Sequence, residues 1–269
     1  MRKSLFLLLL FFFSLNIFSQ KDSIVNYLGY KNKVLKKVDK AYYIEIITKE
    51  SDSLWKRRLF KRNGKLSSYR YYTSANKSKK NRIGQYVVYG KNDSVKNVSF
   101  YNRKGQKHGN FQSWFINNNK NIEGSYVKGK KEGVWRAYHY NGKIAVRSIF
   151  KNDSLIRGDY YNENGVKIKH DTLLCRGIKP KFKGGQKKFT KKLKQLTKEI
   201  TYKVKGRVFV NFTVDINGDL KDIEVYDTIP LKLKKQIVRF FEKIKGWEPA
   251  THKHRRVPFN LTVPLNFQG

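Results

Sequence analysis

The chain has 269 residues, and 59 lysine and arginine residues against 20 aspartate and glutamate residues give it a formal net charge of +39. Hydrophobic residues make up 39%, enough for buried cores, while a charged fraction of 29% excludes a protein with several membrane spans. A single cysteine allows no disulfide within the chain and no cysteine-based metal cluster, and five scattered histidines argue against a histidine-rich metal site.

The N-terminus has the pattern of a secretory signal peptide. Arg2 and Lys3 precede an apolar segment from Leu5 to Phe18, after which polar residues begin. This segment of about 14 residues is shorter than the ~20 that a membrane-spanning helix needs, so we expect cleavage near residue 20 rather than a retained anchor. The sequence therefore predicts export to the periplasm or cell envelope, with residues 1–20 as signal peptide and residues 21–52 as an N-terminal segment.

Export changes the interpretation of the positive charge. An exported protein meets little nucleic acid, so we do not expect a nucleic-acid partner. An anionic membrane surface or envelope polymer would be attracted by the same field. The alternative is that the lysines only keep the protein soluble.

Residues 53–170 repeat a glycine-x-aromatic step at intervals of 25, 24 and 25 residues. The aromatic residues of the four steps are Tyr86, Phe111, Trp135 and Tyr160. Asn141-Gly142 and Asn164-Gly165 follow the last two steps, and Asn-Gly favours a two-residue hairpin turn. The repeat unit is therefore predicted to be a β-hairpin, and stacked hairpins would bury the four rings as a repeat core.

The steps resemble the MORN-type repeats of the bacterial YwqK-like antitoxin-repeat family. The resemblance is carried by Gly-Lys-Lys-Glu-Gly-Val-Trp-Arg-Ala-Tyr at 129–138 and Gly-Gln-Lys-His-Gly-Asn-Phe-Gln-Ser-Trp at 105–114. The last copy departs from the pattern, because residues 153–158 lack the first glycine. The resemblance implies a scaffold or a binding surface, and no acid/base pair recurs that would indicate catalysis.

Residues 171–181 are predicted to be a linker, and residues 182–269 a second domain. Apolar residues there recur first at helical and then at strand spacing. The predicted elements are a helix over 189–200, strands over 208–214 and 220–226, a helix over 233–244 and a strand over 257–267. The expected fold class is mainly β: a stacked β-hairpin array followed by a small α+β domain with a three-stranded antiparallel sheet and two helices.

Motifs along the second domain resemble the TonB C-terminal domain over about residues 180–268. They begin with Phe182-Lys-Gly-Gly185, continue through the predicted first strand and its turn, and end with Trp247-Glu-Pro-Ala250 and the last strand. The motif residues are Gly184, Gly185, Gly206, Val208, Val210, Gly218, Trp247, Pro249 and Ala250.

This resemblance implies a periplasmic, non-enzymatic domain of Gram-negative bacteria. Such a domain engages outer-membrane transporters by adding a transporter peptide strand to its sheet edge, which supports transport across the outer membrane. An outer-membrane transporter or another envelope protein is therefore the expected partner. Full-length energy transducers also carry a membrane anchor and a proline-rich spacer, whereas this chain has five prolines, none in a run. One alternative is an anchored energy transducer, if residues 5–18 are retained. A second alternative is a protein that binds anionic lipid or polymer surfaces through the charge of its repeats.

The last predicted strand contains a possible partner-binding edge. Pro258, Asn260, Thr262 and Pro264 share one edge because alternate residues direct their main-chain groups to the same side. Two prolines remove two donors, which is tolerated only at an outer edge. Asn260 and Thr262 would then offer a short window for strand addition. The alternative is that the prolines block unwanted pairing.

Other candidate chemistry is weak. The run from Asp215 to Asp219 suggests a calcium loop, but the twelfth position is Tyr226 instead of glutamate, so a plain hairpin turn is expected. His252 and His254 lie two residues apart, a spacing that a metal could use but that more often belongs to a solvated loop. Cys175 shows no obvious histidine or acid partner in its segment and is expected to be a packed or linker residue. We therefore expect no catalytic residue, metal site or cofactor.

Overall fold

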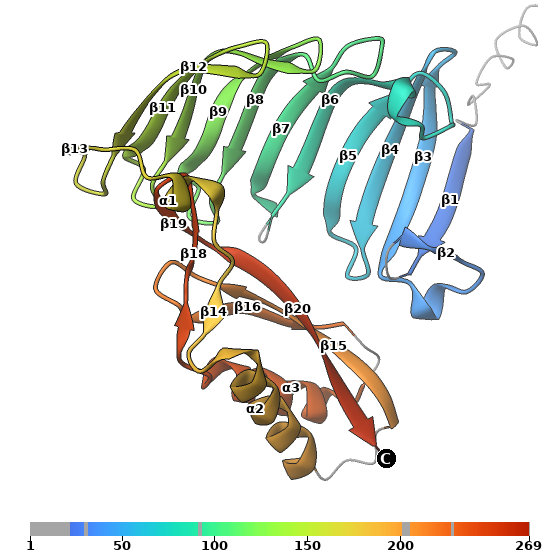
Figure 1. Ribbon diagram of the computed structural model, residues 1–269. Helices are drawn as coiled ribbons and strands as arrows, with labels where there is room; N and C mark the ends of the chain where they lie inside the picture. The colour runs from blue at the N-terminus through green and yellow to red at the C-terminus, as the bar shows by residue number, and fades with distance from the viewer. Residues whose placement is uncertain (1–21, 30–31, 91–92, 201–204, 227–228, 269) are drawn as a thin grey trace, which may run out of the picture.

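The computed structural model of the protein describes residues 22–29, 32–90, 93–200, 205–226 and 229–268. The predicted signal peptide lies outside these residues. A large antiparallel sheet of stacked hairpins precedes a smaller C-terminal domain with two helices (Figure 1), which confirms the predicted fold class.

Within the described residues, thirteen strands form the large sheet, running in order from β13 down to β3 and then to β1 and β2. Strands β1 to β3 lie within the segment that we assigned to a separate N-terminal region, yet β3 pairs with β4, so the sheet already begins at Ser23. The strands are β1 (Ser23–Leu28), β2 (Val34–Leu35), β3 (Tyr43–Ser51), β4 (Leu54–Lys61), β5 (Leu66–Tyr72), β6 (Arg82–Tyr89), β7 (Val95–Tyr101), β8 (Gly109–Trp114), β9 (Lys120–Val127), β10 (Lys130–Tyr138), β11 (Ile144–Lys151), β12 (Ser154–Tyr161) and β13 (Lys167–Ile168).

The hairpin turns correct one prediction. At Asn141-Gly142 only the glycine has a positive φ, of 88°, and His139 N–H donates to Lys143 O while Gly142 N–H donates to His139 O. This is a type I turn followed by a left-handed glycine, not the two-residue turn that we expected. Two-residue turns with two positive φ values do occur elsewhere, for example at Lys128-Gly129, where φ is 50° and 88°.

The repeat aromatics are buried to different degrees. Trp135 and Tyr160 are buried, with Trp135 only 4% exposed, whereas Tyr86 and Phe111 are partly buried. Trp135 stacks on Phe111 with 5.9 Å between ring centroids and covers Gly124 of β9, where a Cβ atom would lie 2.2 Å from the indole. The close approach of this indole to the backbone therefore requires glycine at position 124.

A buried carboxylate stabilises the N-terminal part of the sheet. Glu45 of β3 is 0% exposed and accepts hydrogen bonds from Asn26, Arg57 and Lys77. Burial opposes ionisation, but these bonds outweigh it and hold the pKa of Glu45 below its usual value. The two cations and the amide thus satisfy a charge that would otherwise be costly to bury.

The C-terminal domain has the predicted elements plus four short strands. Helices α2 and α3 pack on one face of the sheet β16-β15-β20, over a core that includes Phe189, Phe212 and Phe241. A helical turn, α1 (Thr172–Arg176), lies in the linker. The remaining elements are β14 (Lys181–Phe182), α2 (Gly185–Glu199), β15 (Lys205–Val214), β16 (Leu220–Val225), α3 (Leu231–Glu242), β17 (Trp247–Glu248), β18 (Ala250–His252), β19 (Arg255–Val257) and β20 (Phe259–Gln268).

Several motif residues of this domain meet around Trp247. The indole lies 5.4 Å from Phe182, because β14 pairs with β17, and 4.9 Å from Phe189 of α2, both measured between ring centroids. Gly218 has a φ of 87°, and a Cβ atom there would lie 2.0 Å from the Trp247 carbonyl oxygen. Glycine at this turn is therefore required by the tryptophan backbone beside it.

Candidate functional site

Strand β20 lies at one edge of the three-stranded sheet. Its described residues pair with β15 on one side, and no strand of the described chain pairs with the other side. The predicted last strand was expected to begin at Val257, but β20 begins at Phe259, because Val257 pairs with Ala250 in a separate hairpin.

The main-chain groups of Asn260 and Thr262 point to this open edge. Phe209 of β15 accepts a hydrogen bond from Tyr226 N–H at 3.0 Å, so its main-chain groups face the β16 side. Phe209 is paired with Pro264, which therefore directs its carbonyl away from β15. The pairing of β20 with β15 contains no bulge, so Asn260 and Thr262, at two-residue intervals from Pro264, face outward as well.

The side chains along the same edge are polar and accessible. Asn260, Thr262 and Pro264 are exposed, and Pro258, directly before the strand, is partly buried. Between the two prolines the edge offers two main-chain donors and two acceptors. An extended segment of another chain could pair with these groups as a fourth strand.

A hairpin that the sequence interpretation missed lies between the domains. Strands β18 and β19 pair through Ala250↔Val257, and their turn places Lys253 and His254 at φ values of 52° and 59°. A two-residue turn without glycine or asparagine gives no turn signal in the sequence. Burial, followed by the charge of Lys131, lowers the pKa of Lys253 to about 8.

Arg255 of this hairpin inserts into the large sheet. Its side chain is 3% exposed, and its Nη1 donates to the carbonyl oxygens of Tyr138 and Asn121, the latter at 3.3 Å. The guanidinium also lies 5.4 Å from the centroid of the Phe115 ring. Burial lowers the pKa of Arg255 to about 10, so the side chain is charged at neutral pH.

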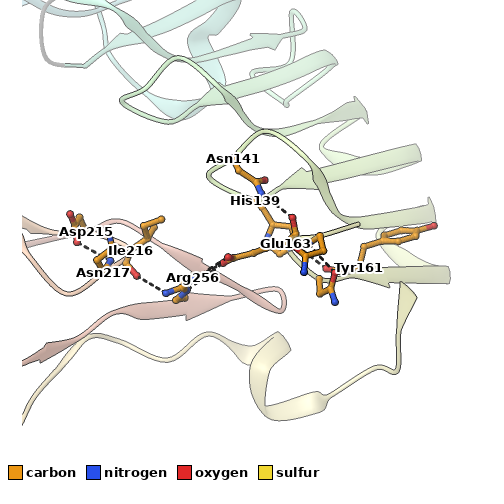
Figure 2. Close-up of polar contacts among 10 residues, drawn as sticks. His139, Asn141, Tyr161, Glu163, Asp215, Ile216, Asn217 and Arg256 are labelled. Atoms are coloured by element: carbon orange, nitrogen blue, oxygen red, sulfur yellow. Dashed lines mark hydrogen bonds and ion pairs between the residues drawn. The ribbon is translucent and has the colours of Figure 1, made fainter. Parts of the chain in front are cut away.

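Arg256 makes a second link, at the surface. Its Nη2 donates to both carboxylate oxygens of Glu163, at 3.0 and 3.1 Å, and its Nη1 donates to Ile216 O at 3.4 Å. Figure 2 shows the arginine between the loop after β12 and the turn between β15 and β16. Asn141 Nδ2 donates to the Glu163 carbonyl oxygen at 2.9 Å and holds this loop in place.

A cleft of about 520 Å³ lies between the repeats and the helix-free face of the small sheet. Lys61 and Lys96 of the repeats, Asp222 and Glu224 of β16, and Asn260 of β20 are among its lining residues. Basic repeats therefore face acidic side chains across the cleft, and the open edge of β20 begins at its wall.

Tyr226 limits the cleft on the acidic side. Its hydroxyl donates to Glu224 Oε2 at 2.8 Å, and its ring lies 5.9 Å from the ring of Tyr42, between ring centroids. Burial, followed by the charge of Glu224, raises the pKa of Tyr226, so the phenol remains protonated. The two domains therefore contact each other near β3 as well as near β12.

The histidines of the hairpin do not form the pair that their spacing suggested. His254 lies beside His170, with 5.4 Å between ring centroids, whereas His252 belongs to β18. Burial, followed by the charge of His170, lowers the pKa of His254. No sequence signal links His170 with His254, because the contact depends on how the two domains pack.

Residues 198–268 match the family described as the Gram-negative bacterial TonB protein C-terminal. The match spans β15 to β20 and excludes the glycines at 184 and 185. No curated protein matches the chain significantly. In the part of the chain that the structure describes, no helix has the length and hydropathy to span a membrane.

The matched family is a non-enzymatic interaction domain of the periplasm and envelope, and its members interact with outer-membrane transporters. The MORN-type resemblance of the repeats stays a prediction. The match supports the resemblance to the TonB C-terminal domain that the motifs of the second domain indicated, over residues 198–268.

Proposed function

We propose that this protein is an exported cell-envelope protein that binds an outer-membrane transporter, or another envelope protein, by strand addition to β20. The observation that carries the proposal is the open edge of β20. There the N–H and C=O groups of Asn260 and Thr262 point away from β15, between two prolines. The family match of residues 198–268 supports the class of partner.

Two substitutions at one position test strand addition. Asn260→Pro removes a main-chain donor from the open edge and leaves the ladder with β15 intact, whereas Asn260→Ala removes only the side chain. Loss of one intermolecular hydrogen bond, at about 1–1.5 kcal/mol, weakens binding roughly tenfold, and the proline ring adds a steric block. We expect Asn260→Ala to bind nearly as well as the unchanged protein.

The probe is a set of synthetic peptides from the periplasmic N-terminal segments of the organism's own outer-membrane transporters. Binding is measured by fluorescence anisotropy, and the thermal unfolding midpoint shows that both variants are folded. Equal affinity of Asn260→Pro and Asn260→Ala for a peptide that binds the unchanged protein would refute pairing at this position.

An anchored energy transducer is the second candidate, and it is favoured by the same family match. The two proposals differ in the fate of residues 5–18, which lie outside the described residues. The intact mass of the protein isolated from its native envelope distinguishes them, because cleavage removes about 20 residues. A mass that corresponds to a chain starting at Met1 would support the anchored transducer.

Binding to anionic surfaces is the third candidate, and a row of cations over aromatic rings along the repeats favours it. Arg70 lies 3.7 Å from the Tyr86 ring centroid, Lys107 lies 4.8 Å from that of Tyr126, and Lys131 lies 4.8 Å from that of Phe150. Binding through this row would weaken steeply as salt rises. Co-sedimentation with anionic vesicles at low and high salt tests it, and salt-independent binding would contradict it.

A further inference from the structure

Three potential metal ligands from separate segments meet where the two domains join. His170 follows β13, Cys175 lies in α1, and His254 lies in the turn between β18 and β19. One ligand atom from each residue lies within 4.8 Å of the other two. We propose that His170, Cys175 and His254 bind a zinc ion.

The separations are close to those of a tetrahedral zinc site. Zinc bonds of about 2.0–2.1 Å to nitrogen and 2.3 Å to sulfur place neighbouring ligand atoms roughly 3.3–3.8 Å apart. Side-chain movements of about 1 Å would therefore bring the three donors into contact with one ion. The imidazoles are held near each other by Tyr160, whose ring centroid lies 4.8 Å from that of His170 and 4.6 Å from that of His254.

His254 has a buried ring nitrogen that the protein leaves unpaired. None of the described residues forms a hydrogen bond with its Nδ1, while Asp171 N–H donates to its Nε2 at 3.2 Å. A buried polar atom without a partner is costly, and a metal ion would satisfy it. Ligation through Nδ1 places the proton on Nε2, so zinc binding would also release the Asp171 amide.

The surroundings of Cys175 suit a thiolate ligand. Its side chain packs against the buried cluster that includes Tyr160, whose ring also contacts both imidazoles, and such packing is typical of the groups that position a metal ligand. A thiolate with two imidazoles matches the preferences of zinc, and three protein ligands leave a fourth position for water.

A bound zinc ion would connect the linker, the last repeat and the inserted hairpin. The hairpin leads directly into Pro258 and β20, so the ion would fix the edge strand relative to the repeats. The sequence does not predict this group, since His254 lies far along the chain from the other two ligands and only domain packing unites them.

Cobalt(II) titration of the full exported chain, reduced and without a histidine tag, tests the proposal. We expect one equivalent to produce a sulfur-to-cobalt charge-transfer band and the intense visible bands of a tetrahedral site. Cys175→Ser should abolish the charge-transfer band, and His254→Asn should weaken cobalt binding at least tenfold. His252→Asn is the matched control, since it alters the same hairpin outside the cluster, and it should bind normally.

A second measurement covers variants that fold poorly. Zinc should slow alkylation of Cys175 by iodoacetamide at least tenfold in the unchanged protein and in His252→Asn, but not in His254→Asn. Cobalt binding without a thiolate band, alkylation that zinc does not slow, or equal effects of the two histidine variants would each overturn the proposal.

Discussion

Replacing Arg255 by alanine should weaken the packing between the two domains more than replacing an exposed arginine at the same junction. Arg255 donates two hydrogen bonds from a buried guanidinium to carbonyls of the large sheet and covers the Phe115 ring. Hydrogen bonds to charged groups contribute about 1.5–3 kcal/mol each, and the contact at 3.3 Å lies at the weak end. Because removal also relieves the desolvation of the cation, we expect a net loss of about 2–4 kcal/mol.

The adjacent Arg256 provides the control. Arg256 and Glu163 form an ion pair in which both side chains are nearly half exposed. Exposed pairs contribute about 0–1 kcal/mol, so Arg256→Ala should change the free energy of unfolding by no more than that. Both variants lose one arginine from the same hairpin. The difference between their free energies of unfolding therefore reports the contribution of the buried contacts of Arg255.

Urea unfolding and amide hydrogen exchange measure the two effects. Arg255→Ala should lower the free energy of unfolding by about 2–4 kcal/mol and accelerate exchange in residues 250–257, since the hairpin loses its contact with the sheet. If Arg255→Ala costs no more than Arg256→Ala, the hairpin is not held by the buried guanidinium, and the reasoning fails.

Three further changes test the packing and the charge distribution. Glu45→Gln should destabilise the fold by about 2–4 kcal/mol at pH 7 because it removes the buried charge that pairs with Arg57 and with the more exposed Lys77. The pKa of Glu45 is lowered by folding, so its contribution exists above the usual pKa of 4.5 and disappears as pH falls through the lower folded value. Urea unfolding at pH 7 and pH 3 should therefore show a smaller difference between variant and parent at pH 3. Gly124→Ala should cost about 1–3 kcal/mol and lower the thermal midpoint, since the added methyl meets the Trp135 indole, and an unchanged midpoint would contradict this contact. Gly218→Ala should cost at least about 1 kcal/mol and alter the near-ultraviolet circular dichroism of Trp247, and an unaltered spectrum would show that the turn tolerates a side chain.

Periodicity predicted the elements that bury a regular apolar face. The spacing of Phe189, Leu193 and Leu196 indicated α2, and alternation from Val208 to Val214 indicated β15, because one face of each element packs into the core. Strand β20 was predicted for the same reason, although its start was placed two residues early. Its position at the sheet edge followed from the prolines, which cannot donate within an inner ladder.

The hairpin between the domains could not be predicted in this way. Strands β18 and β19 have three residues each, too few to show a period, and their turn consists of Lys253 and His254, which carry no turn signal. The groups that hold the hairpin, such as the Tyr138 carbonyl and Glu163, are supplied by residues about a hundred positions earlier. Such a segment acquires its conformation from tertiary contacts, and these are not visible in local sequence.

The inserted hairpin explains how a repeat sheet can influence the function proposed for β20. Arg255 is anchored in the large sheet, and Asn260, where the open edge begins, lies five residues later beyond the constrained backbone of Pro258. The direction of the edge is therefore fixed relative to the cleft, which Asn260 itself lines. A strand added at this position would have one end at the wall of the cleft, so the neighbouring residues of the partner would meet the charged groups there. The main-chain pairing would supply affinity that is nearly independent of sequence, and the cleft would supply the side-chain contacts that discriminate between partners.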